Sequence, residues 1–109
     1  MEKRYSEYTV EELREEVAAL KEKAQRAEQM GHVSEYQIYE RKIQMATAYT
    51  LNPEDIKIGE TYRLKGDPGH TFNVHYLKGV FAWGHRINLL GQMVEKEEAL
   101  PISLLGEKK

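Results

Sequence analysis

Histidines and carboxylates would have to carry any metal or acid–base chemistry in this sequence, because it contains no cysteine. The four histidines are His32, His70, His75 and His85. His70 and His75 are five residues apart in a strand-like run, so they point to opposite faces. If a two-residue turn at Lys78-Gly79 joins the strands, His75 and His85 also fall on opposite faces. No pair then has the spacing of two metal ligands, and the sequence predicts no metal site and no cofactor.

Asp67 and His70 invite an acid–base hypothesis, but both belong to Gly-Asp-Pro-Gly-His, which is a turn by composition. A phosphate-binding loop would need a Gly-Lys-Ser/Thr continuation, and none follows. The serines lack the flanking glycines of a nucleophile elbow. The sequence therefore predicts a protein that is not an enzyme and has no catalytic residues. An enzyme would need a polar pocket around Asp67, His70 and His75.

Composition restricts the class of protein further. The formal net charge is -2 and the pI is near 6.1, whereas nonspecific nucleic-acid binders usually have a basic excess. The balance is -2 over residues 1–53 and zero over residues 54–109, so neither half has that excess. The N-terminal segment lacks an apolar signal-peptide core, and no uncharged run approaches the roughly 18–20 residues of a membrane span. We expect a cytoplasmic protein without a membrane segment.

Two helices should occupy residues 9–51. Thr9 and Glu12 form a capping-box pattern, and Ser34 and Gln37 repeat it for a second helix. Apolar residues spaced by three and four make a narrow seam on the first helix, at Val10, Leu13, Val17, Leu20, Ala24 and Ala27. The short link between the helices requires an antiparallel hairpin, which we assign to a domain of residues 1–53. The seam also leaves a homodimer open as an alternative to packing within one chain.

From Ile56 onward the apolar period changes to two, which predicts short strands joined by glycine turns. With the turn at Lys78-Gly79, the face to be buried carries Phe72, Val74, Tyr76, Phe81, Trp83 and His85. Residues 87–98 leave strand, short helix and loop all open. We expect residues 54–109 to form a small SH3-like β-barrel against which the hairpin packs, giving one compact α+β unit.

Cations and tyrosines of this second half are the candidate binding surface. Three cations on one strand face fit phosphate contact, although exposed edge strands also use such charges against aggregation. A tyrosine has a hydroxyl to bring to the surface and can contact a partner. The sequence thus leaves two binding functions open, a regulator that contacts nucleic acid and a protein interaction module without nucleic-acid contact. The candidate partner-binding residues are Lys57, Tyr62, Arg63, Lys65, Tyr76 and Arg86.

Several motifs along the chain together resemble the YfhH family of small bacterial proteins. They are Met-Glu-Lys-Arg-Tyr-Ser, Lys-Ala-Gln-Arg-Ala-Glu-Gln-Met-Gly, Leu-Asn-Pro-Glu-Asp, Gly-Glu-Thr-Tyr-Arg-Leu, Gly-Asp-Pro-Gly-His-Thr-Phe, Gly-Val-Phe-Ala-Trp-Gly and Glu-Glu-Ala-Leu-Pro-Ile-Ser-Leu-Leu. The resemblance implies a helical hairpin on an SH3-like barrel and a role in transcriptional regulation. It implies no functional residues.

Overall fold

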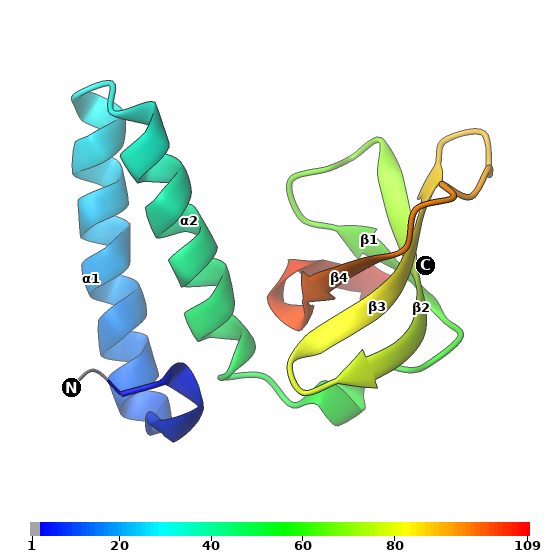
Figure 1. The fold of residues 1–109 in the computed structure, drawn as a ribbon, viewed down its shortest axis with the longest axis horizontal. Helices are drawn as coiled ribbons and strands as arrows, with labels where there is room; N and C mark the ends of the chain where they lie inside the picture. The colour runs from blue at the N-terminus through cyan, green and yellow to red at the C-terminus, as the bar shows by residue number, and fades with distance from the viewer. Residues whose placement is uncertain (1–2) are drawn as a thin grey trace. The chain divides into compact units, whose positions relative to one another are not determined.

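The computed structural model describes residues 3–109, and its chain divides into two compact units (Figure 1). The first unit ends at Leu51 and is helical, and the second spans Asn52–Lys109 and is built around a β-sheet. The fold is therefore of the mixed α+β class. No helix among the described residues is long and apolar enough to cross a membrane. The packing of one unit on the other stays a prediction.

The helical unit contains η1 (Tyr5–Glu7), α1 (Val10–Gln29) and α2 (Val33–Ala48). The predicted capping box of α1 is confirmed, because the Glu12 amide donates to Thr9 Oγ1 at 3.1 Å and the Thr9 amide donates to Glu12 Oε1 at 3.0 Å. Most of the seam of α1 is buried, and the helix packs against the antiparallel α2 (Figure 1). Its buried members are Leu13, Leu20, Ala24 and Ala27, joined by Ala46 and Ala48 of α2.

The second predicted capping box is wrong. Gly31 adopts a φ of 73°, and the chain enters α2 immediately, with His32 at the cap position and no side-chain cap. Ser34 therefore lies inside the first turn, where its own backbone is already helical. The helix ends at Ala48, three residues before the end of the range 9–51 that was expected to be helical.

The second unit holds η2 (Pro53–Asp55), β1 (Thr61–Leu64), β2 (His70–Lys78), β3 (Phe81–Asn88), β4 (Glu98–Pro101), η3 (Ile102–Leu104) and β5 (Leu105–Lys108). All neighbouring strands are antiparallel, in the order β4-β3-β2-β1-β5 (Figure 1). Within residues 3–109 no pairing of β4 with β5 closes this sheet. The core lies on one face, with Phe72, Val74 and Ile102 almost fully buried.

The predicted register between β2 and β3 is wrong, and so is part of the predicted core. Lys78 pairs with Phe81, so the turn is Gly79-Val80, and a bulge interrupts the ladder between Val74 and Tyr76. Phe72 is buried as expected, whereas Phe81 and Trp83 lie half-buried on the opposite face. Gly84 takes the inner position because β2 passes so close that a Cβ there would lie 1.9 Å from the Asn73 carbonyl oxygen.

The segment left open by the sequence forms a tight loop and an irregular return. The Asn88 side-chain oxygen accepts from the amides of Leu90 and Gln92, each at 3.0 Å, which fixes the loop after β3. Met93 then forms an isolated bridge with Ile87 before the chain bends into β4. Pro101 is the last residue of β4, which is an edge strand and so tolerates a residue without an N–H.

Candidate functional site

The predicted partner-binding set does not form one surface, and Tyr62 is the first reason. Its side chain is buried in the core of the sheet unit, and its hydroxyl accepts a hydrogen bond of 2.7 Å from the Lys57 amide. The phenol therefore fixes the irregular segment between η2 and β1, and it has no face left for a partner. The expectation that Tyr62 brings its hydroxyl to the surface is wrong.

Arg86 is not available for the predicted partner contact, because it forms ion pairs with two carboxylates. Its Nη1 donates to Asp67 Oδ2 and its Nε donates to Glu98 Oε1, both at 2.5 Å. Glu98 first and Asp67 second raise the pKa of the guanidinium, which stays charged. A phosphate would have to displace both carboxylates, so Arg86 is an internal tie between the turn after β1 and the edge strand β4.

The remaining four residues are exposed but separated along the chain. Arg63 pairs with Thr71 on the face opposite the core, and Lys65 follows in the turn. Tyr76 lies on β2 beside Trp83, with parallel rings whose centroids are 5.7 Å apart. The Lys57 ammonium donates to the Glu54 carbonyl at 3.2 Å. Their use in partner binding stays a prediction.

A cavity of about 380 Å³ with both charged and apolar lining residues exists at the Gly-Asp-Pro-Gly turn, and His75 does not line it. The His70 Nδ1 lies 3.0 Å from Asp67 Oδ2, and the imidazole, followed by Arg86, lowers the pKa of Asp67. A carboxylate held by two basic partners is a poor general base. The cavity is lined by Arg63, Leu64, Asp67, Pro68, His70, Thr71, Leu89 and Lys109.

A larger surface feature, which the sequence did not predict, lies on the helical unit. A cavity of about 480 Å³ opens between η1, α1 and α2, and four basic residues line it together with three tyrosines. These side chains come from three separate elements, so only the folded hairpin brings them together. The lining residues are Lys3, Arg4, Tyr5, Tyr8, Glu16, Leu20, Lys23, Tyr39 and Lys42.

Two neighbouring cavities extend the first one in both directions. A cavity of about 430 Å³ shares Arg4, Tyr5 and Lys42 with it and adds Arg41, Met45 and Tyr49. Another of about 180 Å³ shares Lys23 and Tyr39 and adds Arg26, Ala27, Met30, His32 and Glu35. The three cavities share lining residues and follow one another along α2, and we call them together the hairpin groove. It follows α2 from His32 to Tyr49, a length of about 25 Å.

The charge of the hairpin groove is strongly positive although its unit as a whole is acidic. Two carboxylates line it, and both have partners: Glu16 accepts from the Tyr8 hydroxyl at 3.3 Å, and Glu35 lies 3.6 Å from His32 Nδ1. Lys3 is paired with Glu12 at 3.0 Å. The basic residues of the groove are Lys3, Arg4, Lys23, Arg26, Arg41 and Lys42.

Tyrosine rings line the hairpin groove beside the basic residues. Tyr5 and Tyr8 meet edge to face, with centroids 5.3 Å apart, and Tyr39 and Tyr49 stand along α2. Cations beside aromatic rings bind phosphate through charge and bases through stacking. The signal was present in the sequence as helical spacing: Lys23 with Arg26, and Tyr39 with Lys42, are both at i, i+3.

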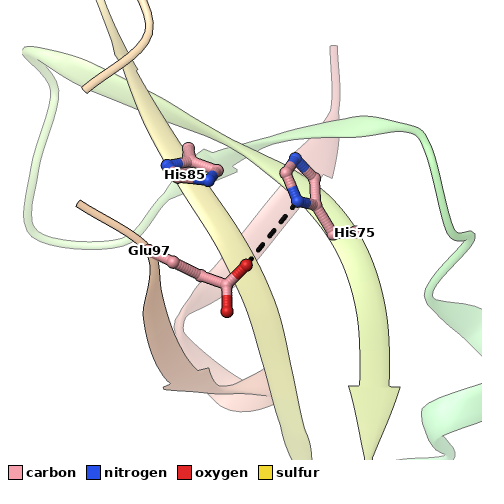
Figure 2. A group of neighbouring side chains, drawn as sticks. All are labelled: His75, His85 and Glu97. Carbon is pink, nitrogen blue, oxygen red and sulfur yellow. Dashed lines mark ion pairs between the residues drawn. The ribbon is translucent and has the colours of Figure 1, made fainter. Parts of the chain in front are cut away.

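The structure also places three potential metal ligands together, against expectation. A bulge between Val74 and Tyr76 leaves His75 without a partner in the β2–β3 ladder. The centroids of the His75 and His85 rings are 4.8 Å apart. The prediction that these two histidines are kept apart by the sheet is therefore wrong. Figure 2 shows the Glu97 carboxylate pointing toward His75 beside the His85 ring.

Comparison with known proteins places the chain in a family without assigning it an activity. The family model described as "Protein of unknown function (DUF1811)" matches residues 3–106. The "Uncharacterized protein YfhH" of Bacillus subtilis (strain 168) is 53% identical over 109 residues, which cover 100% of both chains. The chain therefore belongs to the YfhH family of uncharacterised proteins.

Proposed function

We propose that this protein is a non-enzymatic binding module that contacts single-stranded nucleic acid through the hairpin groove, as a transcriptional regulator or an accessory of one. The observation that carries the proposal is the row of three cavities along α2 that are lined by cations and tyrosines. A groove of about 25 Å is too long for a single phosphate group and suits an extended strand. Phosphates would contact the basic side chains while bases stack on the tyrosine rings.

The non-enzymatic part of the proposal is supported by the state of the Asp67–His70 pair. Asp67 faces both His70 and Arg86, and the pKa of its carboxyl is lowered, so it is poorly suited to accept a proton. A structural role at the turn accounts for both residues. The cytoplasmic location expected from the sequence belongs to the same proposal and suits a chain without cysteine.

We propose that the sheet unit is an SH3-like barrel that supports this function. The strand order β4-β3-β2-β1-β5 and the short helical turn η3 between β4 and β5 support this assignment. The Ile102 amide donates to the Val80 carbonyl at 2.9 Å, which ties η3 to the β2–β3 turn.

A protein interaction module without nucleic-acid contact is the second candidate, and one observation favours it. Tyr76 is 41% exposed and stacks on Trp83, on the sheet face that does not carry the core. Phe81 lies two residues from Trp83 on the same face and is half-buried. Aromatic side chains on an open sheet face are typical of protein-binding surfaces.

Fluorescence anisotropy separates the two functions. Labelled single-stranded and duplex oligonucleotides are titrated with the untagged protein at low and at physiological salt. We expect micromolar binding of the single strand that weakens with salt, with weaker binding of the duplex. Replacing Arg63 and Lys65 with Ala should leave it unchanged, because these residues lie on the sheet unit. Absence of binding at low salt would refute the nucleic-acid function and leave the protein interaction module.

A further inference from the structure

Three side chains with metal-binding atoms converge beside the middle of β3. His75 belongs to β2, His85 to β3, and Glu97 to the segment just before β4. One donor atom from each residue lies within 4.8 Å of the donor atoms of the other two. Figure 2 shows the two imidazoles and the carboxylate gathered around a shared space.

The backbone of the sheet creates this convergence. Asn73 and His85 are direct partners in the β2–β3 ladder, which places His85 on the face opposite the core. If the ladder continued from the Tyr76–Trp83 pair without a bulge, His75 would pair with Gly84 at the inner position and would turn inward. The bulge leaves His75 without a cross-strand partner and directs its ring toward His85. Bulges that re-aim one side chain are common at functional sites.

A hydrogen bond to the backbone sets the tautomer of His85 to one that histidine metal ligands use. Its Nδ1 lies 2.8 Å from the Val94 carbonyl oxygen, which can only accept, so Nδ1 carries the proton. The lone pair is then on Nε2, as in histidine ligands whose other nitrogen donates to a carbonyl. Val94 is itself fixed, because its amide donates to the Arg86 carbonyl at 2.8 Å. The neutral imidazole therefore needs no change of tautomer to coordinate an ion through Nε2.

The other two residues can adjust. The side chains of His75 and Glu97 are 40% and 42% exposed, and His75 Nδ1 lies 3.8 Å from Glu97 Oε2. Ligand atoms around a tetrahedral zinc ion are about 3.3 Å apart, so the largest separation must shorten by about 1.5 Å. Rotation of exposed side chains supplies this movement at little cost. An ion pair at 3.8 Å between exposed groups would by itself contribute little.

We propose that His75, His85 and Glu97 bind a divalent transition-metal ion of the zinc class, with water completing the coordination. Two imidazoles and one carboxylate are a ligand set that zinc accepts at open sites. The mixture of nitrogen and oxygen donors favours zinc, cobalt, nickel or copper over magnesium and calcium, which prefer oxygen alone. The bound ion links β2 and β3 to the segment that leads into the edge strand β4.

Zinc titration of the untagged protein tests the site directly. Isothermal titration should give one zinc ion per chain, and Co²⁺ should give the visible absorption of a four-coordinate complex. His75→Ala, His85→Ala and Glu97→Gln should each weaken zinc binding by at least about tenfold. His32→Ala is the matched control, because His32 lies on the helical unit and should leave the affinity unchanged. Circular dichroism establishes that each variant is folded.

A thermal measurement adds a second readout. Excess zinc should raise the Tm of the wild-type protein, since an ion that binds only the folded state stabilises it, and should not raise the Tm of His85→Ala. Unchanged zinc affinity in the three ligand variants would overturn the proposal. So would one ion shared by two chains, or loss of binding in His32→Ala.

Discussion

Salt dependence gives the sharpest quantitative test of the hairpin groove. Five of its basic residues remain for phosphate contact once Lys3 is assigned to its ion pair with Glu12. If a single strand contacts all five, log Kd should rise with log salt with a slope of about 3.5. Raising the salt from about 50 to about 200 mM should then weaken binding about 100-fold.

The double variant Lys23→Ala/Lys42→Ala should change that slope by a defined amount. Both residues line the largest cavity, one from α1 and the other from α2. With three contacts left, the slope should fall to about 2.1, and the same change in salt should weaken binding only about 20-fold. Anisotropy titrations at four or five salt concentrations measure both slopes.

The control variant Arg14→Ala/Lys21→Ala removes the same total charge from α1. Both residues are exposed and line none of the three cavities. The wild-type slope should therefore be retained, although long-range attraction weakens slightly. Equal slopes for the two double variants would show that the net charge of the protein governs binding. The hairpin groove would then not be the binding site.

Three further predictions concern the sheet unit. Gly84→Ala should lower the free energy of unfolding by at least about 3 kcal/mol in urea titrations, because its Cβ would meet the Asn73 carbonyl at 1.9 Å. Gly69→Ala, whose Cβ would meet an ordinary contact of 3.6 Å, is the control, and equal losses would contradict the argument. Asp67→Asn should reduce the loss of stability in acid. The carboxyl has a lower pKa in the folded chain than its unfolded value of about 4, so its contribution is present above that value and disappears as pH falls through the folded pKa. Identical acid unfolding midpoints for variant and wild type would reject this assignment. Thr71→Val should raise stability by about 1 kcal/mol, because the buried Oγ1 has no partner among the described residues. A lower Tm would show that the hydroxyl is satisfied, and Thr61→Val serves as comparison, since Thr61 Oγ1 accepts from Asn73 at 3.2 Å.

Local patterns predicted the elements of this fold better than they predicted their ends. The same capping-box pattern was right at Thr9 and wrong at Ser34, and the difference lies in what precedes it. Thr9 itself has an extended backbone, so its side chain can accept from the Glu12 amide in the first turn. Ser34 follows Gly31, whose positive φ turns the chain into α2 two residues early.

The candidate sites were missed for two different physical reasons. The hairpin groove was hidden because an average charge over residues 1–53 cannot reveal that the cations of α1 and α2 share one side. The predicted cationic surface failed because Arg86 meets Asp67 and Glu98, contacts set by tertiary structure. Spacing within one helix is readable from sequence, whereas pairing between distant strands is not.

One inserted residue accounts for both errors about the β2–β3 face. Val74 pairs with Gly84 and Tyr76 pairs with Trp83, so His75 is the extra residue of the bulge. The predicted ladder has no bulge and has its turn at Lys78-Gly79, one residue too early. It therefore places Trp83 and His85 on the buried face, whereas both lie on the opposite face. Bulges have no strong composition of their own, so the alternation of polar and apolar residues does not reveal this one.

Deleting His75 tests this account of the register. Without it, Val74–Gly84 and Tyr76–Trp83 become consecutive pairs of a regular ladder, and every other side chain keeps its face. We expect the deletion variant to fold, to retain the near-ultraviolet circular dichroism of the Tyr76–Trp83 stack, and to lose zinc binding. Deleting Asn73 instead forces Phe72 or Val74 out of the core, which should cost about 3–5 kcal/mol or prevent folding. If both deletions destabilise the protein equally, the extra residue is needed for the twist of the sheet. The bulge would then serve the stability of the fold in the first place, and the position of His75 would be secondary.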